Sequence, residues 1–194
     1  MKLKKIVSVM SASLIALGLA TSTSDAYALL GKKLNGGVTY RQYYVTSSAS
    51  THSSKITEMM NKWIYSTASH GITTPLNFSK SSKQYGSEMD FYGGSYDYYP
   101  YRDSAAWEEG WTYSGSQINQ GIKNWDYSKI YLNYFRFNSS STTVKKGTIA
   151  HEMGHAFGLA HVKGIGSLMC TIGGGRIAHW PTADEFKGIN ALYK

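Results

Sequence analysis

The feature that most constrains this chain is the segment HEMGHAFGLAH at residues 151–161. His151 and His155 are four residues apart, so on an α-helix they lie one turn apart on the same face and can reach one metal ion. Glu152 stands beside them, within reach of water at that metal. The apolar residues among positions 149–157 fall on the other side of such a helix. We therefore predict a helix that buries one side and presents two imidazoles to a cleft.

The third histidine of the segment, His161, indicates which kind of metal site to expect. Along a continuous helix His161 would lie about 15 Å from His151, too far to share an ion. Gly158 permits a different path, because glycine can adopt a positive φ, end the helix and turn the chain back toward the metal. Three neutral imidazoles leave one coordination position open, as in a catalytic zinc site. The sequence thus predicts one catalytic Zn²⁺ held by His151, His155 and His161, with Glu152 as the general base.

This extended pattern, HExxHxxGxxH, is typical of the metzincin zinc metalloproteases, and the chain resembles their matrixin branch. Met169 lies eight residues beyond His161, where a matrixin places its Met-turn. The C-terminal segment TADEFKGINALYK is similar to the matrixin C-terminal helix, and the good match covers about residues 143–194. The resemblance implies an α+β fold, with a twisted mixed β-sheet, a zinc-binding active-site helix, a Met-turn and a C-terminal helix. It also implies that Met169 forms an apolar floor beneath the imidazoles without binding the metal.

The chain departs from the matrixin pattern at several points. Residues 71–150 contain no histidine, so the second, structural zinc of vertebrate matrixins has no ligands here. There is no cysteine-switch segment, so we expect no latency by a propeptide thiol. Cys170 follows Met169 where matrixins commonly carry tyrosine, and Val162 replaces a frequent serine. We expect Cys170 to be a small buried hydrophobe, with a reactive thiol near the metal as the alternative.

Other polar residues are weaker site candidates. His179 is expected in a surface loop after the Met-turn, and His52 and His70 are expected to be structural. Acidic residues between positions 90 and 109 could supply oxygen ligands for Ca²⁺, but they lack EF-hand spacing, so a calcium site is only an alternative. These residues are Asp90, Asp97, Asp103, Glu108 and Glu109.

The rest of the chain predicts a single domain. Runs of β-branched and aromatic residues predict strands at residues 38–46, 88–92, 106–113 and 129–137. Helical apolar spacing predicts a helix over about residues 56–70, and serine and threonine N-caps precede a helix that begins near Val144. Thr182 and Glu185 form a capping box for the last helix. The strand at residues 106–113 is expected to pair with an extended substrate.

The N-terminus carries the pattern of a secretory signal peptide. Lysines precede a mostly apolar run at residues 6–20, and Ala-Tyr-Ala at residues 26–28 provides a cleavage site. A membrane anchor is the alternative, but the run is short and interrupted by serines. We therefore predict a signal peptide at residues 1–28 and a zinc metalloprotease catalytic domain at residues 29–194. A secreted chain without paired cysteines is typical of a bacterial exoprotein, so we expect an extracellular location.

Charge and composition limit the partners. The chain has 20 basic and 12 acidic side chains, a net charge of +8, but the basic residues are scattered, so no nucleic-acid interface is predicted. The positive charge suits adhesion to an anionic cell wall. We expect a monomer, not inserted in a membrane after signal cleavage, that acts on proteins or peptides.

The leading hypothesis is a secreted zinc endopeptidase. The alternatives are a zinc-dependent hydrolase of peptidoglycan peptides and a catalytically silent, zinc-stabilised binding module.

Overall fold

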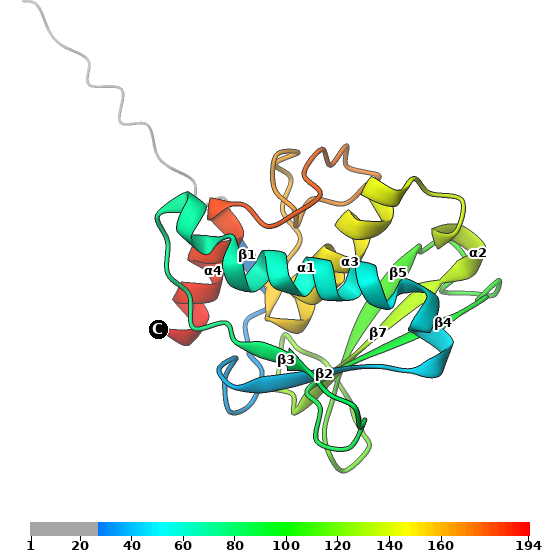
Figure 1. The fold of residues 1–194 in the computed structure, drawn as a ribbon, viewed down its shortest axis with the longest axis horizontal. Helices are drawn as coiled ribbons and strands as arrows, with labels where there is room; N and C mark the ends of the chain where they lie inside the picture. Colours follow the sequence, from blue (N-terminus) through cyan, green and yellow to red (C-terminus); the bar gives the residue numbers. More distant parts are fainter. Residues whose placement is uncertain (1–26) are drawn as a thin grey trace, which may run out of the picture.

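A computed structural model describes residues 27–194, and nearly all of the predicted signal peptide lies outside these residues. Figure 1 shows a twisted sheet with two long helices on one side of it, α1 (Ser53–Tyr65) and α3 (Thr142–Ala156). The six-stranded sheet has the order β3-β2-β4-β7-β5-β6. Its strands are β2 (Arg41–Val45), β3 (Phe78–Lys80), β4 (Met89–Gly94), β5 (Ala106–Trp111), β6 (Gln117–Ile118) and β7 (Tyr127–Asn133). The predicted α+β fold with a mixed sheet is confirmed.

The strand directions leave one sheet edge open. Strands β3, β2, β4 and β7 are parallel, whereas β5 is antiparallel to β7. The short strand β6 pairs only with Gly110 and Trp111 at the end of β5. Within the described residues, positions 106–109 of β5 therefore have backbone partners on the β7 side alone. Their other side is a sheet edge that can accept another extended chain.

The core lies between the sheet and the helices. In β7 the side chains of Ser128, Ile130 and Leu132 are fully buried, whereas the alternate residues face the outer side of the sheet. Trp63 of α1 is fully buried against Phe157, with ring centroids 5.2 Å apart, and its indole donates to the Ala150 carbonyl of α3 at 3.1 Å. This packing fixes α3 between α1 and the sheet.

The predicted caps of the last two long helices are present, whereas the helix predicted over about residues 56–70 ends earlier, at Tyr65. Ser141 is the N-cap of α3, and its hydroxyl accepts from the Val144 amide. The last helix, α4 (Ala183–Tyr193), begins with the capping box of Thr182 and Glu185. Helix α1 is preceded by the 3₁₀ helix η1 (Ser47–His52) and followed by η2 (Thr67–His70).

The predicted strand at residues 129–137 is wrong in its second half. Strand β7 ends at Asn133, and the next residues form one helical turn, α2 (Tyr134–Phe137). Asn133 is fully buried, and its side-chain oxygen accepts from the amides of Phe135 and Tyr96. This side-chain capping outweighs the alternating pattern of the sequence, which continues through the turn.

Four short strands were not predicted: β3 and β6 in the main sheet, and two that pair with each other. β1 (Ala28–Leu29) pairs antiparallel with β8 (Leu159–Ala160), which follows α3 directly. The beginning of the described chain thus packs beside the segment that leads to His161. No helix in residues 27–194 has the length and apolarity that a membrane crossing requires.

Candidate metal centre

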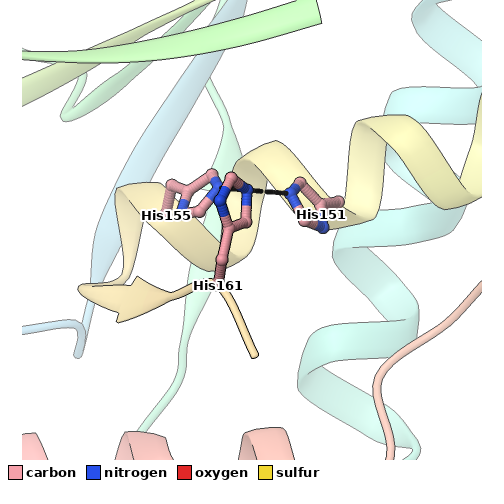
Figure 2. A group of neighbouring side chains, drawn as sticks. All are labelled: His151, His155 and His161. Atoms are coloured by element: carbon pink, nitrogen blue, oxygen red, sulfur yellow. Dashed lines mark hydrogen bonds between the residues drawn. The ribbon is translucent and has the colours of Figure 1, made fainter. Parts of the chain in front are cut away.

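Helix α3 positions two of the three predicted metal ligands. His151 is 5% exposed and His155 is half-buried, one turn further along the same helix. The helix ends at Ala156, and Gly158 has φ +98°. The chain then turns back through β8, so that His161 approaches the other two from outside the helix (Figure 2).

The structure brings the three imidazoles together. The Nε2 atoms of His151, His155 and His161 lie 3.0–3.2 Å from one another, and Figure 2 shows all three rings directed at one point. Three nitrogens bound to one tetrahedral zinc ion at its usual bond length are about 3.3 Å apart. Within the described residues this is the one group of at least three His, Cys, Asp or Glu side chains close enough to hold a metal. The donor geometry therefore fits zinc.

The backbone fixes the tautomers that metal binding needs. Nδ1 of His151 lies 2.7 Å from the Leu168 carbonyl oxygen, and Nδ1 of His155 lies 2.8 Å from that of Leu159. Because a carbonyl only accepts, each Nδ1 must carry the proton, which leaves both Nε2 atoms as bare lone pairs. Lone pairs that face one another at these distances repel unless a cation lies between them.

Burial keeps the ligand histidines neutral. It lowers the pKa of His155 to about 4 and that of His151 well below its ordinary value, and the charges of neighbouring histidines act in the same direction. Burial also lowers the pKa of His161. At neutral pH all three rings are therefore unprotonated, as metal ligands must be.

Glu152 is 7% exposed and faces the same cleft as the histidines. Burial, together with the charge of Glu108, raises the pKa of its carboxyl group to about 8. A nearby cation would favour the ionised form of this carboxylate. Glu152 is thus a carboxyl group whose proton affinity lies in the range needed to accept and return a proton near neutral pH.

Met169 lies beneath the metal-binding helix. It is 2% exposed, and a Cβ atom on Gly154 of α3 would collide with its Sδ atom. Its amide donates to Ser167 Oγ at 3.0 Å and to Glu185 Oε1 at 3.3 Å. The other oxygen of Glu185 accepts from the amide and hydroxyl of Thr182, at 2.8 and 2.7 Å. The loop under the histidines is therefore hydrogen-bonded to the start of α4.

A cleft of about 630 Å³ contains the three histidines and Glu152. One wall is the open edge of β5, and the opposite wall is formed by α3 and the loop after Met169. The residues that line it besides the site itself include Ala106, Trp107, Glu108, Val144, Thr148, Ile172 and Arg176. A larger cavity of about 890 Å³ lies by residues 84–92 on the outer face of the sheet and contains none of the histidines. The chemistry therefore lies in the smaller cleft.

The other predicted candidates lie outside the centre. Cys170 is 1% exposed, and its thiol lies near the carbonyls of Thr171 and Gly174, as expected for a small buried residue. His52 is buried against Tyr134 and Phe137. His179, expected at the surface, is instead half-buried against α3, because Gly147 within that helix has no side chain and leaves room for it.

The five acidic residues considered for calcium do not converge. Each has its own partners: Ser87 and Gln84 for Asp90, Arg102 for Asp97, Arg136 for Asp103, Gln120 for Glu108, and the indoles of Trp107 and Trp111 for Glu109. The structure thus gives no support to a calcium site among them.

Two of the charged residues that line the cleft, Glu108 and Arg176, were not predicted to belong to the site, and Glu108 was expected only as an alternative calcium ligand. Burial raises the pKa of Glu108 to about 8, whereas the hydrogen bond from Gln120 at 3.0 Å opposes this effect. The inward position of Glu108 follows from strand alternation, since Trp107 and Glu109 lie on the outer face. No local pattern marks Arg176.

The family model for Matrixin matches residues 33–194, and no curated protein sequence matches the chain. The match covers the sheet, the histidine cluster, the Met169 loop and α4, well beyond the C-terminal region where the resemblance was apparent. Together with the geometry of the site, it shows that the chain belongs to the matrixin family of zinc-dependent metalloendopeptidases.

Proposed function

We propose that the protein is a secreted zinc endopeptidase that hydrolyses internal peptide bonds in the cleft between β5 and α3. The observation that carries this proposal is the convergence of three imidazole Nε2 atoms, 3.0–3.2 Å apart, beside the buried carboxyl group of Glu152. A structural zinc site has no need of a general base or of an open position in a cleft.

The cleft suits an extended peptide. Positions 106–109 of β5 offer backbone groups to a strand laid along the sheet edge, and residues 106–108 line the cleft that holds the histidines. A substrate held in this way passes its backbone between β5 and α3. The protein therefore fixes the peptide by main-chain hydrogen bonds, and the side-chain preference comes from the opposite wall.

The residues divide the chemistry among them. His151, His155 and His161 would hold the zinc ion, which when bound makes water more acidic and polarises the scissile carbonyl. Glu152 accepts the proton of the attacking water and delivers it to the departing amine. Leu168 and Leu159 orient two of the imidazoles through their carbonyl oxygens. Met169 supports the helix from below and makes no bond to the metal.

The test is digestion of a diverse peptide mixture by the zinc-loaded protein, read by mass spectrometry, with and without a zinc chelator. Glu152→Gln should abolish cleavage while zinc content is retained. Glu109→Gln is the matched control. Glu109 accepts hydrogen bonds from two indoles on the outer face of the sheet, so this variant should cleave peptides like the wild type. Cleavage that persists in the chelator or in Glu152→Gln would refute the mechanism.

The same experiment separates the alternatives. Release of peptides from purified cell walls, without cleavage of the peptide mixture, would favour a peptidoglycan hydrolase. Zinc binding without any hydrolysis would favour a silent binding module. We further propose that residues 1–28 are removed on secretion, that residues 29–194 form the catalytic domain, and that the domain acts as a monomer. N-terminal sequencing of the exported protein, its hydrodynamic mass and its elution from cell walls by salt test these points.

A further inference from the structure

Arg176 is a buried cation in the wall of the catalytic cleft. It is 8% exposed and lies in the loop that follows Met169. Its Nη1 donates to the Leu168 carbonyl at 3.3 Å, and its Nη2 lies 3.5 Å from Thr148 Oγ1. Its buried Nε has no hydrogen-bond partner within residues 27–194. The guanidinium group is thus held by neutral acceptors, and part of its donor capacity is unused.

No carboxylate neutralises this arginine in the described part of the chain. The other three arginines are each ion-paired: Arg41 with Glu88, Arg102 with Asp97, and Arg136 with Asp103. Burial lowers the pKa of Arg176, and the charge of Glu152 opposes this effect, but the two groups form no ion pair. Charged side chains are rarely buried without a partner, because desolvation is not compensated. A buried, unpaired guanidinium in a cleft is therefore typical of a site for an anionic ligand group.

The position of Arg176 places it beside the histidine cluster. Its Nη1 and the Nδ1 of His151 donate to the same Leu168 carbonyl oxygen. The guanidinium group therefore lies directly behind a metal ligand. Gly173, which lines the same cleft and belongs to the same loop, has no atom within 4 Å of where a Cβ atom would lie, so the cleft is open beside it. A substrate side chain next to the scissile bond can reach Arg176 from there.

We propose that Arg176 is a specificity-determining residue that binds a substrate carboxylate, so that the enzyme prefers aspartate or glutamate next to the bond it cleaves. This inference rests on the proposed endopeptidase function and names its substrate class. A carboxylate matches the fork of guanidinium donors and supplies the missing negative charge. Arg136 also lines the cleft, but Asp103 already binds it at 2.8 Å. Arg176 alone among the cleft arginines is available for a new ion pair.

The test compares peptide substrates that differ only in the residue flanking the scissile bond. The wild-type protein should cleave a glutamate peptide about 10- to 100-fold more efficiently, in kcat/KM, than its glutamine counterpart, as a charge-assisted hydrogen bond implies. Arg176→Gln should reduce this ratio to about 1, and Arg176→Lys should give an intermediate ratio. Arg136→Gln is the matched control and should keep the wild-type ratio, because it removes a cleft arginine that is already neutralised.

Each outcome decides a different point. Chelator-sensitive cleavage without an acidic preference, or a preference that survives Arg176→Gln, would overturn the inference and leave the endopeptidase intact. The absence of any cleavage by the wild type would refute the proposed function, and the inference with it. If Arg176→Gln does not fold, the inactive Glu152→Gln protein provides a second test. By fluorescence anisotropy it should bind the glutamate peptide about tenfold more tightly than the glutamine peptide, and equal binding would overturn the proposal.

Discussion

Replacement of Gly158 by alanine should damage both the stability and the metal site. Gly158 has φ +98°, where an L-residue costs about 1–3 kcal/mol. Its new Cβ would lie 2.8 Å from Leu192 Cδ1 and 3.2 Å from the Lys32 carbonyl oxygen. The leucine can move and the backbone carbonyl cannot, so overpacking adds about 1 kcal/mol. We expect a loss of about 2–4 kcal/mol in unfolding free energy, together with weaker zinc binding because the path to His161 shifts.

Two other glycines separate these contributions. Gly115 also has a positive φ, +87°, but no atom lies within 4 Å of where an added Cβ would be. Its alanine variant should therefore lose only about 1–2 kcal/mol of unfolding free energy. Gly164 has open space and no positive φ, so its alanine variant should be neutral or slightly stabilised. Urea unfolding in excess chelator measures stability, and competition with a chromophoric chelator measures zinc affinity. If Gly158→Ala is within about 0.5 kcal/mol of Gly164→Ala, the reasoning about the helix end is wrong.

Three further predictions concern the same region. Gly154→Ala should lower the unfolding free energy by about 1–3 kcal/mol and weaken zinc binding, because its Cβ collides with Met169; unchanged thermal melting and zinc titration would contradict this. The metal-free protein should lose stability as the pH falls from about 6.5 to 4. In this range His155 is protonated in the unfolded chain but stays neutral in the folded protein, where burial lowers its pKa to about 4, so acid favours the unfolded chain. Urea midpoints that do not change with pH would contradict this. Glu108→Gln should gain stability relative to the wild type as the pH rises from 4.5 through 8, because the folded carboxyl group holds its proton up to about 8 and the unfolded one does not. The gain at pH 9, relative to pH 5, should be about 1–4 kcal/mol by urea unfolding, and an equal response of both proteins would exclude the burial argument.

Local sequence rules predicted most of the histidine cluster that fits a metal ion. The four-residue spacing of His151 and His155 is a property of the helix itself, and the capping residues Ser141 and Thr182 act within one turn of chain. These features need no knowledge of distant residues. The match of the whole domain to the matrixin family agrees with the fold they implied.

The features that could not be predicted depend on distant contacts. Asn133 ends β7 because the buried side chain meets the backbone of Tyr96, 37 residues away along the chain. Arg176 lies in the cleft because it reaches Leu168 and Thr148 across a loop and a helix. In the sequence it is one charged residue next to three glycines, and no periodicity distinguishes it from a solvent-exposed side chain.

The link from Glu185 to the loop at Met169 has a consequence for biosynthesis. One oxygen of this carboxylate caps the final helix, and the other holds Ser167 and the Met169 amide beneath the histidines. All three histidines leave the ribosome before Glu185 does, because translation proceeds from the N-terminus. A partly synthesised chain therefore carries every metal ligand but lacks the support that positions them. In such a chain the histidines are present, but the loop at Met169 has no Glu185 to hold it, so the last helix takes part in forming the metal centre without supplying a ligand to it.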